Sequence, residues 1–220
     1  DPADYPLLAA EIGITASTLT DVGAAVLLTA AQWRNVAAAI ERLRLGAKQA
    51  VAAATTIAAV HGPCVGYGLT GVLFCDFVIA TPAATFSYPE VRLGVPTIVG
   101  AIRLPRRIGW ANAMELLLTG EPMSAQRAVE VGLVWRLAEP DELQSQARAW
   151  AEVLTQAAPL AQRATKEVAW RTADMGWIES VRFGEVMRKV AGATDDVAAG
   201  LQAWREKREP DWRGRRPRRT

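Results

Sequence analysis

Residues 55–68 read TTIAAVHGPCVGYG, an apolar run with β-branched side chains followed by a segment rich in glycine. The run predicts a short buried strand over Thr55–Val60, because glycine and proline bound it closely. We expect a loop over His61–Gly68 next, and then a buried helix through Leu69–Cys75. Phe77–Ala80 has the composition of a second strand. This alternation of strand, helix and strand is typical of an α/β core.

Further elements are expected on both sides of this core. Thr85–Glu90 is a short extended run that its proline ends, Gly94–Gly100 is expected to form a loop, and Leu133–Leu137 is a further candidate strand. Ser124 is expected to cap a helix that Gly132 ends. The spacing of apolar residues predicts helices over residues 29–46, 111–118, 125–131, 141–157, 160–172, 177–190 and 195–207.

The composition changes near residue 138, beyond which only helices are expected. We therefore predict two parts, an α/β core over residues 1–137 and a helical region with a basic tail over residues 138–220. The helical region is rich in aromatic side chains, namely Trp150, Trp170, Trp177, Trp204 and Trp212. These indoles could pack against another subunit or pack the helices on the core, and both interpretations stay open.

Charge and composition exclude several classes of function. Of the 220 residues, 50% are hydrophobic and 22% are charged, which supports a folded unit rather than a disordered chain. The net charge is +2, but residues 205–220 hold eight arginine and lysine residues against three acidic ones. The rest of the chain therefore lacks the basic balance of a nucleic-acid-binding protein. The acidic, polar start has no signal-peptide pattern, and we expect a cytoplasmic protein.

One histidine and two cysteines limit the chemistry further. A zinc site or a Ser-His-Asp hydrolase would depend on the single imidazole of His61, and we expect neither, so no metal is predicted. Cys64 and Cys75 are too few for a disulfide scaffold and suit a reducing cytosol. Gln49–Cys75 carries no charged residue and is long enough to cross a bilayer, but glycine and proline interrupt it. We therefore favour a strand, a loop and a buried helix there over a membrane span.

The glycine-rich loop is the first candidate site. Residues without bulky side chains let backbone N–H groups approach a ligand oxygen, so Gly66 and Gly68 around Tyr67 could hold an anion or a polarised carbonyl group. Gly71 completes the spacing G-x-G-x-x-G, but the strand and acidic residue that a dinucleotide site requires do not follow. Close packing of the backbone is the simpler alternative.

Glu90 is the second candidate. It is expected at the end of an apolar extended run, and a carboxylate against apolar walls suits proton transfer near neutral pH. The alternative is an ordinary surface glutamate that pairs with Arg92. The residues around it, taken alone, favour the surface glutamate.

Several short segments between Thr56 and Val134 occur in a characteristic order and spacing. They are IAAVHG (57–62), GYG (66–68), CDFVIA (75–80), ATFSYPEVRLG (84–94), RLPRRIG (103–109), AMELLLTG (113–120), SA (124–125) and GLV (132–134). In this order they resemble the crotonase superfamily, the enoyl-CoA hydratase/isomerase family. The run EKREPDWRGR (206–215) is similar to the ending of many members.

This resemblance implies an α/β fold built as a spiral of β-β-α units, with a C-terminal helical region that assembles homotrimers or dimers of trimers. It implies an acyl-CoA thioester as the substrate, with coenzyme A as part of that substrate and no separate cofactor. Backbone N–H groups would receive the thioester oxygen as it gains enolate charge. By position, the Tyr67 amide is one of these donors, and Gly66 and Gly68 shape its loop. Most members have glycine at position 67, and a tyrosine restricts φ and narrows the pocket.

The resemblance also assigns catalytic roles. Glu90 matches the glutamate that exchanges a proton at the α-carbon of the substrate, whereas Thr70 stands where hydratases have a second glutamate that holds water. A threonine hydroxyl can hold a water molecule but cannot act as its general base near pH 7. We therefore expect an enoyl-CoA hydratase/isomerase-type enzyme with proton transfer by a single glutamate. An enoyl-CoA double-bond isomerase and a catalytically silent acyl-CoA-binding subunit are the alternatives.

The N-terminal region departs from the family pattern. Neither the Asn-Arg-Pro strand segment nor the A-G-x-D-type loop that supplies a second oxyanion donor is present. Residues 1–11 resemble the first helix of the family and residues 12–17 its next strand. We therefore expect the N-terminal part of the core to be abridged or incomplete, and residues 21–24 receive no site role.

Overall fold

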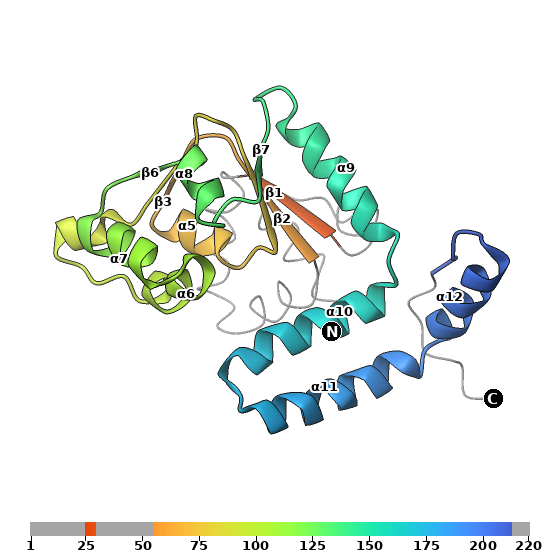
Figure 1. The fold of residues 1–220 in the computed structure, drawn as a ribbon. Helices are drawn as coiled ribbons and strands as arrows, with labels where there is room; N and C mark the ends of the chain where they lie inside the picture. The colour runs from red at the N-terminus through yellow and green to blue at the C-terminus, as the bar shows by residue number, and fades with distance from the viewer. Residues whose placement is uncertain (1–24, 30–54, 213–220) are drawn as a thin grey trace, which may run out of the picture.

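The computed structural model describes the backbone of residues 25–29 and all of residues 55–212. The features expected in residues 1–24 lie outside this part. The predicted helix over residues 29–46 also lies outside it, except for its first residue, Thr29, which ends a strand. The structure is a mixed α/β fold in which a four-stranded sheet lies among helices (Figure 1).

The four-stranded sheet is parallel throughout and has the strand order β1-β2-β4-β7. Its strands are β1 (Ala25–Thr29), β2 (Thr55–Val60), β4 (Phe77–Ala80) and β7 (Arg136–Leu137). A smaller sheet has the order β3-β5-β6, and its strands are β3 (Pro63–Val65), β5 (Thr85–Ser87) and β6 (Met123–Ser124). In the smaller sheet β3 and β5 are parallel, and this pairing aligns Val65 with Ser87.

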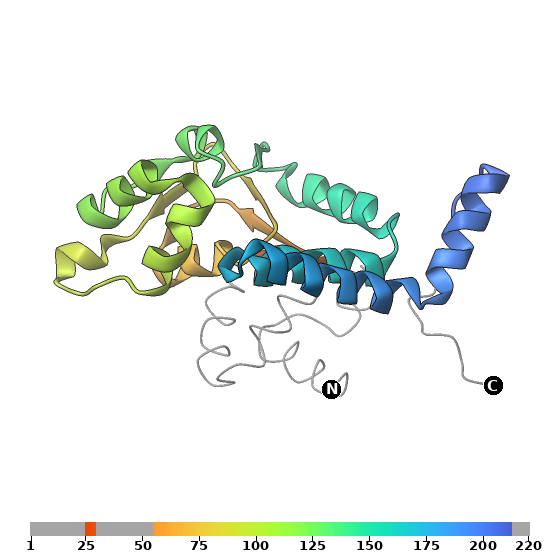
Figure 2. The ribbon, with the colours of Figure 1, turned by 60° about the horizontal axis from the view of Figure 1, so that its bottom comes forward.

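Helices surround the two sheets. They are α5 (Tyr67–Val72), the 3-10 helix η2 (Pro89–Leu93), α6 (Val99–Ile108), α7 (Trp110–Thr119), α8 (Ala125–Glu130), α9 (Leu143–Thr155), α10 (Pro159–Arg171), the 3-10 helix η3 (Thr172–Asp174), α11 (Trp177–Gly192) and α12 (Asp195–Glu206). Helix α9 packs on β1, β2 and β4, and α10 contacts β2. Figure 2 shows α9 on one side of the sheet and the antiparallel pair α10 and α11 on the other, with α12 projecting away from the body.

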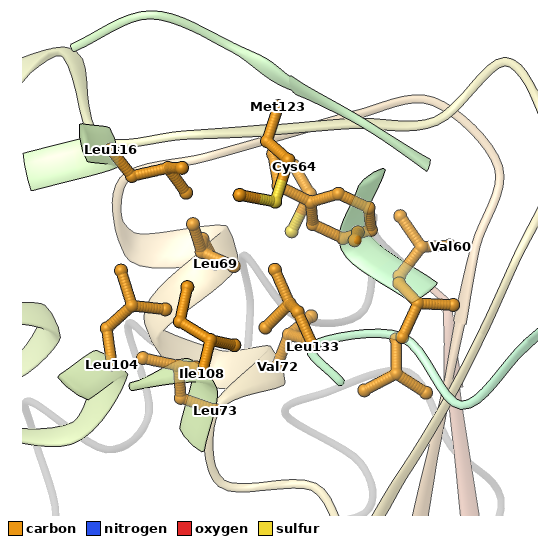
Figure 3. Close-up of a cluster of buried hydrophobic side chains, with 14 of the residues drawn as sticks. Val60, Cys64, Leu69, Val72, Leu73, Leu104, Ile108, Leu116, Met123 and Leu133 are labelled. Atoms are coloured by element: carbon orange, nitrogen blue, oxygen red, sulfur yellow. The ribbon is translucent and has the colours of Figure 1, made fainter. Parts of the chain in front are cut away.

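The four-stranded sheet separates two clusters of buried apolar side chains. Ala58 and Val60 of β2 face a larger cluster that includes side chains of α5, α6, α7 and α8, part of which Figure 3 shows. Ile57 and Ala59 point to the opposite face and join a smaller cluster with α9. Because both faces are covered, residues 57–60 of the strand are all apolar, which is typical of parallel sheets.

Several sequence predictions are confirmed. Strands β2 and β4 have the predicted bounds, and the four C-terminal helices begin and end within two residues of the expected positions. The Ser124 side chain caps α8 by accepting a hydrogen bond from the Arg127 amide at 3.2 Å. Gly132 follows the helix end with a φ of 80°, which favours glycine.

Other predictions about the core were wrong in detail. The loop expected over His61–Gly68 contains strand β3, and helix α5 begins at Tyr67 and ends at Val72. The strand expected over Leu133–Leu137 covers only its last two residues, because the Leu133 and Val134 amides donate to the Ala128 carbonyl oxygen of α8 instead of to a strand. Within the described residues, no helix combines the length and the apolar character that a bilayer crossing requires.

Helix α6 was not predicted, and it takes the end of the loop expected over Gly94–Gly100. Gly100 and Pro105 lie inside this helix, and both residues are unfavourable in helix interiors. The Gly100 position has a packing reason: an added Cβ would lie 2.5 Å from the Tyr88 ring. Tertiary packing therefore outweighs local propensity here.

The tryptophans of the C-terminal helices divide between the two interpretations. Trp150 packs edge-on against Phe77, and Trp170 stacks on Phe74 at 5.8 Å between ring centroids. Trp177 and Trp204 are 82% and 79% exposed, so neither packs the helices on the core. Assembly through this region remains a prediction.

Candidate active site

The glycine-rich loop makes a sharp bend at Gly66. Its backbone has φ 54° and ψ −114°, in the region that favours glycine. The Gly66 N–H donates a hydrogen bond to the Ser87 carbonyl oxygen at 3.0 Å, which extends the pairing of β3 with β5. This contact holds the bend beside the segment that leads to Glu90.

The Glu90 carboxyl group lies directly over this bend. Its Oε1 atom is 2.7 Å from the position that a Cβ on Gly66 would take, so a side chain there would displace the carboxyl group. The Oε2 atom is buried and makes no hydrogen bond within the described part of the chain. A buried polar atom without a partner is costly, and this oxygen keeps its full capacity to accept a proton or a hydrogen bond.

Two expectations for Glu90 were wrong. Pro89 starts the 3-10 helix η2 and Glu90 lies inside it, rather than at the end of an extended run. The alternative of a surface pair with Arg92 also fails, because the Arg92 guanidinium pairs with Glu121 and donates to the Thr119 carbonyl oxygen at 2.7 Å. Within the described residues, no ion pair of the structure involves Glu90.

Tyr67 is the first residue of α5, directly after the bend. An amide in the first turn of a helix has no intrahelical acceptor, so it is available to a ligand oxygen. The sequence suggested that a tyrosine would disturb this geometry, but the positive φ falls on Gly66, and Lys207 is the only non-glycine described residue with positive φ. The Tyr67 side chain is 70% exposed and points away from the core.

Gly68 differs from Gly66. A Cβ at Gly68 would meet the Cys64 sulfur at 3.9 Å, which is an ordinary van der Waals contact. The steric requirement for glycine therefore applies at position 66, and Gly68 contributes no comparable close approach.

Thr70 lies one turn further along α5, where its amide donates to the Gly66 carbonyl oxygen at 2.9 Å. Its Oγ1 atom is 3.0 Å from the hydroxyl oxygen of Tyr88, which is fully buried. Burial raises the pKa of the Tyr88 phenol above its ordinary value, so the phenol is protonated at neutral pH. Sequence reasoning missed Tyr88, although a phenol in a buried strand run needs a hydrogen-bond partner and this signals a polar contact.

The structure thus brings the Glu90 carboxyl group, the Gly66 bend and the start of α5 at Tyr67 together, with Thr70 one turn away. Such an arrangement combines a proton acceptor with a backbone donor that faces no intrahelical partner. Residues 1–24, which lack the A-G-x-D-type loop of a second oxyanion donor, lie outside the described residues.

The chain belongs to the crotonase superfamily, because residues 34–215 match the family model for enoyl-CoA hydratase/isomerase. It is similar to probable enoyl-CoA hydratase echA8 of Mycobacterium bovis, with 39% identity over 75% of this chain and 65% of that protein. It is also similar to (E)-benzylidenesuccinyl-CoA hydratase of Thauera aromatica, with 40% identity over 72% of this chain and 62% of that protein. The chain thus matches less than two thirds of the length of these relatives.

Comparison of structures gives the same family. The crystal structure of an enoyl-CoA hydratase from Bacillus anthracis superposes with a TM-score of 0.76 and 27% identity, covering 97% of this chain and 88% of that one. The mixed α/β architecture with helices at the C-terminus is therefore the crotonase-type fold that the sequence predicted.

Proposed function

We propose that the protein is an enoyl-CoA hydratase/isomerase-type enzyme that acts on an acyl-CoA thioester through an enolate. Glu90 takes a proton from the α-carbon, and the Tyr67 amide donates a hydrogen bond to the thioester oxygen as negative charge develops. The observation that carries this proposal is the position of the Glu90 carboxyl group on the Gly66 bend, next to the first amide of α5. Coenzyme A is part of the substrate, and no separate cofactor is needed.

Each group has a physical role in this reaction. A positioned general base contributes roughly 10²–10⁴ in rate, provided that it reaches the proton that it removes. A backbone donor aimed at the developing oxyanion contributes about 3 kcal/mol of transition-state stabilisation. Gly66 supports both, because it turns the chain into α5 and leaves the space that the carboxyl group occupies.

Hydration and double-bond isomerisation make different demands on this site. A single carboxylate can remove a proton at C2 and return it at C4, which is isomerisation. Hydration requires an activated water molecule as well, and Thr70 offers a hydroxyl rather than a second carboxylate. The names of the relatives, both hydratases, favour hydration, so we propose both activities with Glu90 as the shared proton carrier.

Assays of the full chain with a 2-enoyl-CoA and a 3-enoyl-CoA test this proposal. We expect turnover of at least one substrate, and a loss of at least 10²-fold in Glu90→Gln. Glu115→Gln is the matched control, because Glu115 is exposed on α7 and has no role in the proposed reaction. Equal turnover in Glu90→Gln and Glu115→Gln would remove Glu90 from the mechanism.

A silent acyl-CoA-binding subunit is the second candidate, and the threonine at position 70 favours it, because a two-glutamate mechanism is incomplete there. In that case the protein binds the thioesters and turns over neither. We also propose that the protein is cytoplasmic and assembles as a homotrimer or a dimer of trimers. The exposed Trp177 and Trp204 would become buried in this assembly. Sedimentation of the full chain measures the oligomeric state.

A further inference from the structure

The 3-10 helix η2 carries Glu90 but is weakly anchored by its own residues. None of its five residues is buried, so no apolar side chain of η2 fixes it in the core. Tyr88, directly before it, is fully buried and holds its N-terminal end. Residues 91–96, which follow Glu90, are all exposed. Because segments with few buried contacts open readily, the C-terminal part of η2 depends on a contact of another kind.

Arg92 makes such a contact, at the end of α7. Its Nε atom donates a hydrogen bond to the Thr119 carbonyl oxygen at 2.7 Å, and its Nη2 atom pairs with the Glu121 carboxylate. Thr119 is the last residue of α7, and its carbonyl group has no intrahelical partner there. The guanidinium therefore uses two N–H groups to bind two acceptors, which its planar fork allows.

The chain after α7 is shaped to receive this side chain. Gly120 has a φ of 67°, in the region that favours glycine. A Cβ added there would lie 3.1 Å from both Cγ and Nε of Arg92, so the arginine stem lies close against bare backbone. The C-terminal end of a helix also carries partial negative charge, which favours a cation at this place.

The exposure of this ion pair indicates what the contact does. The side chains of Arg92 and Glu121 are 51% and 65% exposed, and an ion pair this exposed contributes little to the stability of a fold. The contact instead fixes η2 relative to α7, and with η2 the Glu90 carboxyl group on the Gly66 bend. Such precision matters, because a displacement of about 1 Å can cost roughly 10²-fold in rate.

We propose that Arg92 is a positioning residue for the reaction, which holds η2 against the C-terminal end of α7 and thereby keeps the Glu90 carboxyl group in place. The inference rests on the proposed function, in which Glu90 moves the proton. Arg92 acts through the backbone of η2, because its guanidinium pairs with Glu121 rather than with Glu90.

Steady-state kinetics of the full chain with the enoyl-CoA that the parent turns over tests this proposal. We expect kcat to fall about tenfold or more in Arg92→Ala, with KM within about twofold of the parent, because a displaced base affects the transition state rather than binding. Arg127→Ala is the matched control. Arg127 pairs with Glu130 on α8 and is 47% exposed, close to the value of Arg92. Both variants should melt near the parent temperature, and Arg127→Ala should keep the parent kcat.

Arg92→Lys separates the two-acceptor contact from the positive charge. Lysine keeps the charge but replaces the fork by one compact ammonium group, so we expect a kcat between those of the parent and of Arg92→Ala. A parental kcat in Arg92→Lys would show that charge suffices and would overturn the proposal.

Other results would also overturn the positioning role of Arg92. They are an unchanged kcat in Arg92→Ala, a loss of equal size in Arg127→Ala, a rise in KM as large as the fall in kcat, and a failure of Arg92→Ala to fold. The proposed function fails in a different way, if the parent turns over no enoyl-CoA or if Glu90→Gln keeps the turnover of the parent. A loss in Glu90→Gln without a loss in Arg92→Ala would leave that function in place and refute this inference alone.

Discussion

The Glu90 carboxyl group occupies the space next to Gly66 that a side chain would fill, with Oε1 2.7 Å from the position of a Cβ on residue 66. The two residues are brought together by the parallel pairing of β3 with β5 and by the hydrogen bond from the Gly66 amide to Ser87. The close contact couples the backbone bend to the position of the catalytic candidate. A substitution at either residue therefore changes the other.

Gly66→Ala should reduce activity at least tenfold and destabilise the fold. The added Cβ would force the Glu90 carboxyl group away, and the φ of 54° costs a non-glycine residue about 1–2 kcal/mol. Gly62→Ala is the control in the same loop, because a Cβ there meets nothing within 4 Å. Turnover and thermal melting of both variants check this. Equal activity in the two would show that the close contact does not matter for the reaction.

Thr70→Glu should shift the balance between the two reactions. A second carboxylate one turn after the Gly66 bend can act as a general base for water, and such a base is worth roughly 10²–10⁴ in rate. We expect the ratio of hydration to isomerisation to rise at least tenfold. Thr70→Gln has similar size without the charge and should leave the ratio near that of the parent. A ratio that rises equally in both variants would point to shape rather than to base catalysis.

Asp76 ties a C-terminal helix to the core. Its Oδ2 atom accepts hydrogen bonds from the Thr56 amide at 2.7 Å and from Lys166 of α10 at 2.6 Å. Because the ion pair is largely buried, we expect Asp76→Asn to lower the free energy of unfolding by about 3 kcal/mol. Glu130→Gln removes an exposed pair with Arg127 and should cost no more than about 1 kcal/mol. Urea denaturation compares the two, and equal losses would contradict this role of Asp76.

The two thiols make the fold sensitive to alkaline pH. Burial raises the pKa of both Cys64 and Cys75 to about 12. Above the pKa of an unfolded thiol, about 8.5, the unfolded chain loses protons that the folded chain keeps. The free energy of unfolding therefore falls as the pH rises, by about 1 kcal/mol per pH unit for each thiol. The double variant Cys64→Ala/Cys75→Ala should show a smaller loss between pH 8 and pH 10, and a loss equal to that of the parent would disprove this origin.

The sequence predicted those parts of the fold that local patterns determine. Residues 57–60 of strand β2 are all apolar because both faces of the strand are covered, and this composition is visible in the chain itself. The N-cap at Ser124 is also determined locally, because its side chain bonds to the amide of Arg127, three residues further along the chain. Helix α6 was not predicted because it contains Gly100, a residue that is unfavourable in helices. The reason for this glycine is its close contact with Tyr88, which lies in a different element and is not visible in the local sequence.

The same distinction applies to the site. Residue types and the family resemblance selected Glu90, Tyr67 and Thr70, but no local pattern places the carboxyl group on Gly66 rather than beside Arg92. Strand pairing between β3 and β5 decides this, and the partner of a short strand is set by the whole fold. Tyr88 was missed for the same reason, since its contact with Thr70 joins α5 to the residue that follows β5.

Exchange of the α-protons of a saturated acyl-CoA in D₂O examines the transfer of a proton by Glu90 without requiring hydration or isomerisation. Mass spectrometry follows deuterium uptake in the parent protein, in Glu90→Gln and in Glu115→Gln, with thioester binding measured in parallel. We expect uptake with the parent and with Glu115→Gln, and a rate at least 10²-fold lower with Glu90→Gln while the thioester still binds. Equal uptake with Glu90→Gln and the parent would contradict the account.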